Sequence, residues 1–244
     1  MQNEGYVHSI QTLGTLDGPG LRYVIFMQGC ALRCAFCHNP DTWRMVYGRL
    51  VTVDWLVNDI KQYFPYIKRT GGVTVSGGEP LLQADFLGVL FRRLGFWNIH
   101  RVIDTSGFVR LEQVKEILDE TDLVLMSIKH ALPAQHILLT GQPPDRPQEF
   151  AAYLTSINKP VWLRYVLIPD YTNGREDLEA LAGLIRPMTN VQRLELLPYN
   201  DMGKSKWQEL GLSSSLPDLR PPEEDEINRS RELLTQLLPG LTIY

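Results

Sequence analysis

Three cysteines, Cys30, Cys34 and Cys37, are the only cysteines in the 244-residue chain, and they lie within eight residues of one another. Their C-x3-C-x2-C spacing places three thiols on one segment, and thiolates are ligands that both iron and zinc bind well. A secreted disulfide scaffold would instead spread an even number of cysteines along the chain. The sequence therefore predicts a metal centre at this segment.

Two kinds of metal centre compete for these thiols. A structural zinc site normally has four ligands in two C-x2-C pairs. The one additional candidate, His38, adjoins Cys37, and adjacent side chains seldom converge on one tetrahedral ion. A 4Fe–4S cluster held by three thiolates keeps one iron open to a substrate or cofactor. The residues therefore favour a catalytic cluster over zinc.

Other polar and glycine residues follow the ends of predicted strands. Arg164 lies within an apolar strand, where a buried guanidinium needs an anionic partner. The segments that follow strand ends are Gly77-Gly78-Glu79, Asp104–Ser106, Lys129 and Pro198–Asn200. Their common position predicts one site at one edge of a sheet.

The elements that must position these residues alternate along the chain. The β-rich runs are Leu21–Gln28, Gly72–Ser76, His100–Thr105, Asp122–Ile128, Val161–Ile168 and Val191–Leu197. The runs with helical spacing are Asp54–Lys68, Ala84–Leu94, Leu111–Glu120, Gln148–Ile157, Arg175–Ile185 and Glu223–Leu238. Six strand–helix units predict an α/β fold with parallel strands, either a doubly wound open sheet or a complete or partial barrel. Six units are too few for the closed eight-stranded barrel, and in each case the working residues lie beyond the carboxyl ends of the strands.

Composition excludes several classes of partner. The net charge of −4 argues against a nucleic acid, which needs clustered Lys and Arg. No apolar run approaches the length of a membrane span, and the N-terminus lacks the profile of a signal peptide. We expect a cytoplasmic protein with one domain, 1–244, and irregular loops at Asn39–Leu50 and Asp201–Pro222. His8 and His136 are expected on the surface or in loops.

The segment Cys30-Ala-Leu-Arg-Cys34-Ala-Phe36-Cys37 resembles the C-x3-C-x-aromatic-C signature of the radical S-adenosylmethionine (SAM) superfamily. The resemblance implies a partial (β/α)6 TIM-like barrel, open at the side, and an oxidoreductase whose 4Fe–4S cluster is held by the three cysteines. It also implies that the amino and carboxylate groups of SAM chelate the free iron. One electron then splits the sulfonium, and the 5′-deoxyadenosyl radical abstracts a hydrogen atom from the substrate.

A finer resemblance is to the activating enzymes of glycyl-radical enzymes, and it spans essentially the whole chain. The segments that carry it are Gly14–Arg22, Met27–Trp43, Val73–Gln83, Ile103–Phe108, Val161–Pro169 and Leu194–Trp207. It implies a protein substrate, a glycyl-radical enzyme of the pyruvate formate-lyase type, whose glycine Cα–H bond is cut. The residues implied to seat the glycine-bearing loop, within an N-terminal turn at 1–20, are Asp17, Gly18, Pro19 and Gly20. A flavodoxin or ferredoxin would donate the electron, in anaerobic metabolism, to a monomer whose C-terminal loop and helix span 201–244.

The resemblance also implies a SAM site. Phe36 would lie against the adenine, Glu79 would hold the amino group, and Arg164 is the candidate partner of the carboxylate. The full set is Phe36, Cys37, His38, Gly77, Gly78, Glu79, Asp104, Lys129 and Arg164, with Ser127, Ile128 and Asn200 in addition. Asp104 and Thr105 would bind a monovalent cation beside SAM.

Three positions depart from the family's pattern. Ser127 stands where the family has a carboxylate, Asn200 where close relatives have a histidine, and Ser106 where asparagine is usual. The loss of one carboxylate weakens a cation site built from hard oxygen ligands. The cluster and the SAM chemistry do not depend on it.

Alternatives to this function differ in substrate and in class. A second enzymatic hypothesis is a radical SAM enzyme acting on another glycyl-radical enzyme or on a small molecule, as in deazapurine biosynthesis (7-carboxy-7-deazaguanine synthase-like). Many activating enzymes of other glycyl-radical enzymes carry an additional ferredoxin-like domain, and three cysteines are too few for its clusters. A metal-binding interaction module is the non-enzymatic hypothesis, but it would not need the polar residues at the strand ends.

Overall fold

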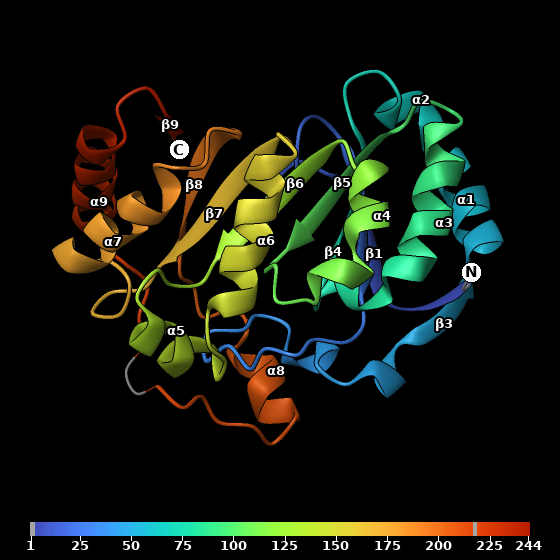
Figure 1. Ribbon diagram of the computed structural model, residues 1–244. Helices are drawn as coiled ribbons and strands as arrows, with labels where there is room; N and C mark the ends of the chain where they lie inside the picture. The colour runs from blue at the N-terminus through green and yellow to red at the C-terminus, as the bar shows by residue number, and fades with distance from the viewer. Residues whose placement is uncertain (1–2, 217–218) are drawn as a thin grey trace. The chain divides into compact units, whose positions relative to one another are not determined.

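The computed structural model describes residues 3–216 and 219–244 (Figure 1). The chain divides into two compact units. Unit 1 takes in the chain up to Ala31 together with Thr42–Leu125, and unit 2 takes in Leu32–Asp41 and the chain from Met126 onwards. The division passes through the cysteine segment, so Cys30 belongs to unit 1, whereas Cys34 and Cys37 belong to unit 2.

Unit 1 is built on strands β1 to β5. Their bounds are β1 Glu4–Gly14, β2 Arg22–Met27, β3 Arg49–Thr52, β4 Gly72–Gly77 and β5 His100–Thr105. The hydrogen-bonded order is β3-β1-β2-β4-β5. β1 is antiparallel to both of its neighbours, whereas β2, β4 and β5 are parallel and begin in register at Arg22, Gly72 and His100. The carboxyl ends of these three strands therefore lie at one edge.

The helices of unit 1 bury apolar faces. They are α1 Val53–Lys61, α2 Phe64–Ile67, α3 Ala84–Gly95 and α4 Lys115–Asp119, with short 3-10 turns η2 Met45–Tyr47, η3 Pro80–Gln83 and η4 Leu111–Gln113. Figure 1 shows α3 and α4 side by side. The predicted single helix 54–68 is interrupted, because Pro65 has no amide to donate and instead starts the new turn of α2.

Unit 2 contains the remaining strands and helices. Its parallel strands β7 Val161–Leu167, β8 Val191–Pro198 and β9 Thr242–Ile243 pair in that order. Strand β6, Leu123–Ile128, spans the division between the units. The helices are α5 Pro133–Thr140, α6 Asp145–Ser156, α7 Arg175–Ile185, α8 Lys204–Glu209 and α9 Glu224–Leu237, and η1 spans Pro40–Thr42 at the other division. Figure 1 shows α7 and α9 packed together, in agreement with their contacts.

The fold is α/β with a mostly parallel sheet that does not close into a barrel, as the sequence predicts. In the described part of the chain, five strands and α-helices were not predicted, and one of them is the short β9. β1 and β3 precede and follow the expected first strand, and only three of the 11 residues of β1 are buried, which leaves a weak pattern. The predicted loop 201–222 contains α8, and α5 fills a segment assigned to no element. Within the described residues, no helix is long and apolar enough to cross a membrane.

Arg22 ties the amino ends of the parallel strands together in unit 1. Its side chain is fully buried. Nε donates to Thr74 Oγ1 at 2.8 Å, Nη2 to the Val73 carbonyl at 2.7 Å, and Nη1 to the Pro19 carbonyl at 3.2 Å. Nη1 also lies 3.3 Å from His100 Nδ1, which must accept because a guanidinium only donates. Burial lowers the pKa of Arg22 to about 10.

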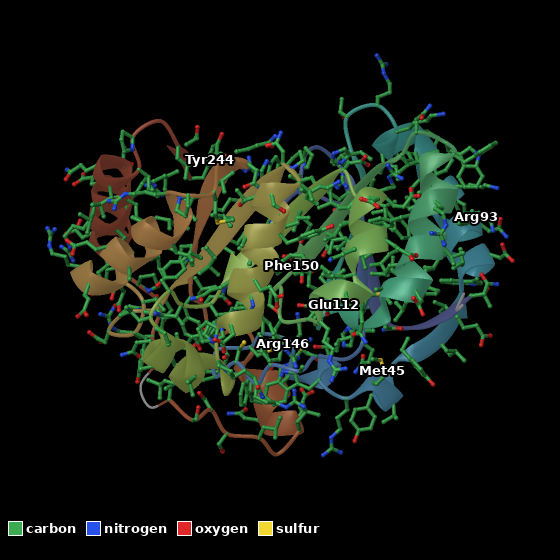
Figure 2. The ribbon with its side chains drawn as sticks, viewed as in Figure 1. Met45, Arg93, Glu112, Arg146, Phe150 and Tyr244 are labelled. Atoms are coloured by element: carbon green, nitrogen blue, oxygen red, sulfur yellow. The ribbon has the colours of Figure 1, made fainter. Side chains whose placement is uncertain are left out.

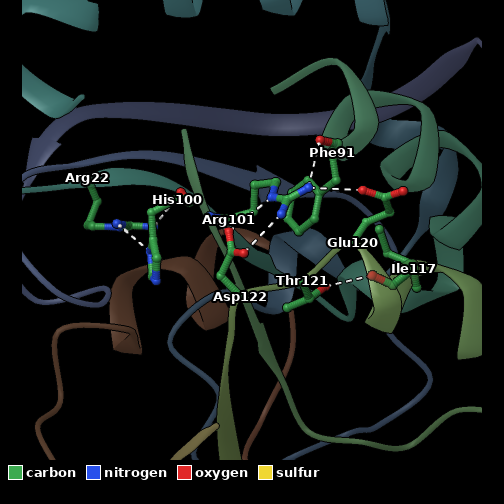
Figure 3. Close-up of polar contacts among 8 residues, drawn as sticks. All are labelled: Arg22, Phe91, His100, Arg101, Ile117, Glu120, Thr121 and Asp122. Atoms are coloured by element: carbon green, nitrogen blue, oxygen red, sulfur yellow. Dashed lines mark hydrogen bonds and ion pairs between the residues drawn. The ribbon is translucent and has the colours of Figure 1, made fainter. Parts of the chain in front are cut away.

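A second guanidinium, that of Arg101, follows His100 in β5 and lies on the other side of His100 from Arg22 in Figure 3. Arg101 pairs with Asp122 through two hydrogen bonds, of 3.0 Å from Nε and 2.9 Å from Nη2, and with Glu120 at 3.0 Å. The Arg22 guanidinium is bonded to Thr74, to backbone oxygens and to His100, and the charge of Asp17 favours its protonated form. These several acceptors hold the Arg22 guanidinium in one geometry.

Replacing Arg22 with lysine tests this arrangement. An ammonium on a flexible stem cannot reach all the acceptors of the guanidinium, so Arg22→Lys should lower the free energy of unfolding by about 2–4 kcal/mol. Arg93, which lies on the surface of α3 and pairs with Asp54, provides the control (Figure 2). Arg93→Lys should change stability by less than about 0.5 kcal/mol. Urea unfolding followed by circular dichroism measures both, and equal losses would contradict the account.

Candidate active site

The segment that leads into Cys30 lies against the end of β4 in unit 1. The Gly78 amide donates to the Met27 carbonyl at 3.0 Å, and the Glu79 amide donates to the Gly29 carbonyl at 2.7 Å. A Cβ at Gly78 would lie 2.2 Å from the Gly29 oxygen and 3.3 Å from Cys30 Cβ. Two glycines at the end of β4 are needed here because backbone approaches backbone. The structure thus brings Cys30 and Gly77-Gly78-Glu79 together, as predicted.

The carboxylate of Glu79 is buried and fully hydrogen-bonded. Oε1 accepts from the Thr105 hydroxyl at 2.6 Å and from the Leu81 amide at 3.2 Å. Oε2 accepts from the Ser106 hydroxyl at 2.6 Å and from the Ser106 amide at 3.0 Å. Burial raises the pKa of Glu79, and these four donors act in the opposite direction. The carboxylate therefore links the end of β4 to the end of β5, and the predicted contact with the SAM amino group stays a prediction.

Asp104 and Thr105 end β5 with hydrogen bonds inside unit 1. Asp104 Oδ2 accepts from the Ser76 hydroxyl at 2.8 Å. Thr105 Oγ1 accepts from the Gly107 amide at 2.9 Å while it donates to Glu79. Their role in binding a monovalent cation stays a prediction.

The turn Asp17–Gly20 joins β1 to β2 and lies over one face of the sheet in unit 1. The Asp17 carbonyl accepts from Thr74 Oγ1 at 2.6 Å, and a Cβ at Gly18 would lie 3.6 Å from Val102 Cγ2. Side chains two residues apart on a strand point to the same face. The turn therefore shares its face with Asp104, which is two residues, or about 7 Å, beyond Val102 along β5.

In unit 2, Cys34 lies beside a cation. Burial raises the pKa of the Cys34 thiol to about 11, whereas the charge of Lys129 lowers it. Lys129 Nζ lies 5.8 Å from the centre of the Phe36 ring. The amide of Cys37 donates to the Cys34 carbonyl at 3.1 Å, so the two cysteines close one turn. The structure thus gathers Cys34, Phe36, Cys37 and Lys129.

A cavity of about 360 Å³ opens beside this turn within unit 2. Its lining includes Phe36, Cys37 and His38 of the cysteine segment, and Tyr199 and Asn200 after β8. The remaining lining residues are Ala35, Gly203, Lys204, Trp207, Gln208, Ser214, Leu216 and Leu219. His38 Nε2 donates to the Asn200 carbonyl at 3.0 Å. Four residues of the predicted SAM set therefore line one cavity of suitable size for part of that ligand.

Arg164 in β7 has a carboxylate partner from the neighbouring strand. Its Nε donates to Glu195 Oε2 at 2.8 Å, and Arg193 donates to the other oxygen of Glu195. The buried guanidinium thus has the anion that its burial requires. Binding of the SAM carboxylate by Arg164 stays a prediction, as do the roles of Ser127, which is half-buried in β6, and of the buried Ile128.

The chemistry of the cysteine side chains fits an iron–sulfur cluster. None of the three is in a disulfide, and three thiols without a carboxylate form a soft donor set that suits iron with sulfide. Within the described ranges, no three His, Cys, Asp or Glu side chains already converge as a metal-ligand group. The assignment of the three cysteines as ligands therefore rests on donor chemistry and stays a prediction.

Sequence inspection missed several residues around the cysteine segment. His136, expected on the surface or in a loop, is buried in α5, and its Nδ1 donates to the Gln142 carbonyl at 2.7 Å. That expectation is wrong. Trp207 and Ser214 donate to carbonyls of the cysteine segment from within a predicted loop. The signal that could have been used was the tryptophan itself, a large aromatic residue in a segment rich in serine and proline.

Glu79→Gln tests the link between the ends of β4 and β5. In glutamine, one of the two accepting oxygens becomes an amide NH2 group, which donates and cannot accept. That group would face either the two donors of Ser106 or those of Leu81 and Thr105. The free energy of unfolding should therefore fall by about 1–3 kcal/mol. Glu112, exposed at the start of η4 (Figure 2), is the matched control, and Glu112→Gln should have little effect. Chemical denaturation measures both. A Glu79→Gln protein as stable as the control would show that the four bonds are not important.

Comparisons with known proteins agree with this arrangement. The model of the radical SAM superfamily matches residues 24–185. A pyruvate formate-lyase-activating enzyme from Staphylococcus epidermidis is 45% identical over 93% of this chain and 94% of its own length. The crystal structure of a domain of a pyruvate-formate lyase-activating enzyme from Bacteroides vulgatus matches with a TM-score of 0.60 and 25% identity, over 71% of this chain and 98% of that one.

A third likeness concerns the fold alone. Streptococcus suis SuiB, in its crystal structure with the precursor peptide SuiA, matches with a TM-score of 0.68 at 16% identity, over 91% of this chain and 48% of that one. Superfamily membership implies a 4Fe–4S cluster and SAM as cofactors. The extent of the superfamily match and the identity to the staphylococcal relative show that this chain is a member of the radical SAM superfamily, in the family of the activating enzymes.

Proposed function

We propose that this chain activates a pyruvate formate-lyase by cleaving SAM reductively and removing one hydrogen from a glycine Cα of that enzyme. The observation that carries the proposal is the 45% identity to a staphylococcal pyruvate formate-lyase-activating enzyme, which extends over nearly the full length of both chains. The end-of-strand residues described above are consistent with that chemistry.

Cys30, Cys34 and Cys37 would hold the 4Fe–4S cluster. The cluster, when bound, supplies the electron that cleaves the carbon–sulfur bond of SAM. The cavity lined by Phe36, His38 and Asn200 would accept the adenosine part of SAM, because an aromatic residue next to polar residues suits a flat, polar base.

Glu79 would act on this site by fixing its neighbours. Because both of its oxygens accept two hydrogen bonds, the carboxylate holds the ends of β4 and β5 at one separation. Asp104 and the glycines of β4 are then presented from a rigid edge. Lys129, close to both Cys34 and Phe36, would provide positive charge near the carboxylate of SAM.

The protein substrate would enter along the face that carries the turn Asp17–Gly20. Arg22 and Thr74 hold the carbonyls of this turn, so its outer surface is presented in one conformation. The turn shares its face with Asp104, a residue of the predicted SAM set in unit 1, which supports this face as the one that a glycine-bearing segment approaches. A flavodoxin or ferredoxin would supply electrons, and the chain would act as a monomer.

The second candidate is a radical SAM enzyme with a small-molecule substrate. It differs from the first in what stimulates SAM cleavage. An activating enzyme would produce one 5′-deoxyadenosine for each glycine hydrogen removed, and its yield would rise with the amount of pyruvate formate-lyase added. An enzyme with a small substrate would not respond to that protein.

Cys34→Ala tests the cluster ligands. Two thiols cannot hold the cluster with one open iron, so this variant should form at least about 100-fold less 5′-deoxyadenosine than the native chain after anaerobic reconstitution with iron and sulfide. Production is measured by chromatography with dithionite as the reductant. Turnover near the native level would refute the ligand assignment, and no cleavage by a well-loaded native protein would refute the function.

Ser127→Asp tests the weakened cation site. A carboxylate adds a hard anionic ligand, so the affinity of the variant for SAM should depend on added sodium or potassium more strongly than that of the native chain. Equilibrium binding of SAM to the loaded protein, with and without the salts, measures the difference. Ser127→Asn, which adds size without charge, controls for shape, and the idea is wrong if the aspartate variant responds to salt no more than the native chain.

A further inference from the structure

We propose that the cysteine loop, residues 32–41, is held in its ligand-binding conformation by two sets of contacts from outside the cysteine motif, with Trp207 and Ser214 as positioning residues. One set comes from the end of α5, and the other comes from the strap, defined here as residues 200–216. The inference rests on the proposed function in that Cys34 and Cys37 are taken as cluster ligands. Unit 2 contains the loop and both sets of contacts.

The end of α5 binds the amides on either side of Cys34. The Arg33 amide donates to the Thr140 carbonyl at 2.9 Å, and the Ala35 amide donates to the Leu139 carbonyl at 2.9 Å. The last carbonyls of a helix have no donor within the helix and must find one elsewhere. The cysteine loop supplies these donors, so it caps α5 at the same time as α5 fixes the loop.

The α5 end is itself well ordered by local bonds. Thr140 Oγ1 donates to the His136 carbonyl at 2.7 Å, and His136 Nδ1 donates to the Gln142 carbonyl at 2.7 Å. Gly141 follows with φ of 73°, the left-handed conformation that commonly ends a helix. The two carbonyls that hold the loop therefore project from a fixed turn.

The strap donates hydrogen bonds to the carbonyls of the loop, whereas α5 accepts from its amides. Trp207 Nε1 donates to the Cys37 carbonyl at 2.8 Å, and Ser214 Oγ donates to the Ala35 carbonyl at 2.8 Å. Ala35 is thus bonded through its amide to α5 and through its carbonyl to the strap. Cys34 and Cys37 lie on either side of a residue whose peptide groups are fixed from two directions.

The strap also contacts the part of the loop that follows Cys37. Lys206 Nζ donates to Asn39 Oδ1 at 2.8 Å and lies 3.0 Å from Asp41 Oδ2. A Cβ at Gly203 would lie 2.8 Å from His38 Cα, so the strap touches the loop backbone directly. Figure 1 shows the loop, in blue, running between α5 and α8, the helix that carries Trp207.

These contacts matter because the loop has little regular structure of its own. Buried backbone groups need hydrogen-bond partners. A loop that must keep two thiols at fixed positions needs partners that are themselves fixed, and mobile water molecules are not. The bonds from Trp207 and Ser214 would therefore lower the cost of ordering the loop when the cluster binds and would slow its loss.

Trp207→Phe tests the proposal, with Trp162→Phe as the matched control. Trp162 is also in unit 2 and donates its Nε1 to one oxygen, Gln192 Oε1 at 2.9 Å, away from the loop. Each variant therefore loses one indole hydrogen bond and keeps an aromatic ring. In the metal-free full-length protein, Trp207→Phe should increase amide hydrogen exchange in residues 33–39 by about 3- to 10-fold, whereas Trp162→Phe should leave it unchanged.

A second measurement uses the reconstituted protein. Trp207→Phe should lose iron to a chelator about 3- to 10-fold faster than the native chain, and the electron paramagnetic resonance signal of its reduced cluster should shift. Ser214→Ala should also lose iron faster than the native chain. Its control is Ser156→Ala, which removes a hydroxyl hydrogen bond to the Tyr153 carbonyl and should not change the rate of iron loss. Circular dichroism and thermal unfolding establish that each variant folds. If Trp207→Phe does not fold, the comparison of Ser214→Ala with Ser156→Ala tests the proposal instead.

The outcomes separate the two proposals. If Trp207→Phe and Ser214→Ala match their controls in both exchange and iron loss, the strap does not position the loop and the inference is wrong. If exchange rises as expected but the native protein binds no cluster, the contacts hold the loop and the proposed function fails instead.

Discussion

The backbone polar groups of residues 32–41 set the constraint on which the rest of unit 2 depends. This segment carries Cys34 and Cys37, and no strand or long helix of its own pairs its amides and carbonyls. α5 supplies acceptors for two amides, and Trp207 and Ser214 supply donors for two carbonyls. The motif sets the spacing of the thiols along the sequence. Their positions in space depend on residues about 100 and 170 positions further along the chain.

Unit 1 meets a similar need with a charged group. Glu79 accepts four hydrogen bonds in a buried position and so fixes the end of β4 against Thr105 and Ser106. Burial disfavours a carboxylate, and its four donors offset that cost. At the other end of the same strands, Arg22 is held by neutral oxygens and His100. Each end of the parallel strands is thus fixed by its own buried ionisable side chain with several partners, Glu79 at one end and Arg22 at the other.

The sequence predicted the parts of the site that local patterns encode. The parallel strands were readable from continuous apolar runs, and the prediction that polar residues cluster beyond their carboxyl ends places Cys30 with Gly77–Glu79 and Phe36 with Asn200. Ser106 was singled out as a departure from the family, and the structure gives it two bonds to Glu79. A serine hydroxyl can donate as an asparagine amide does, so the side-chain bond to Glu79 does not require asparagine.

The remaining parts could not be predicted, for reasons that are physical. α8 spans six residues and has no buried face, so it leaves no periodic signal. The bond from Trp207 to Cys37 joins residues 170 positions apart, and nothing near either residue indicates the other. His136 looked like a surface residue because one histidine in a helix has no pattern, yet it fixes the turn that holds the cysteine loop. Arg164 was expected to need an anion, and Glu195 on the neighbouring strand became visible only through the register.

The central claim is that this chain removes a hydrogen atom from a glycine of another protein. The most direct measurement incubates the reconstituted protein, SAM and a reductant anaerobically with a pyruvate formate-lyase, and records the electron paramagnetic resonance spectrum. The account predicts a glycyl radical signal that requires SAM, changes its splitting when the lyase carries glycine deuterated at Cα, and is absent with the Cys34→Ala variant. SAM cleavage without any glycyl radical signal would contradict it.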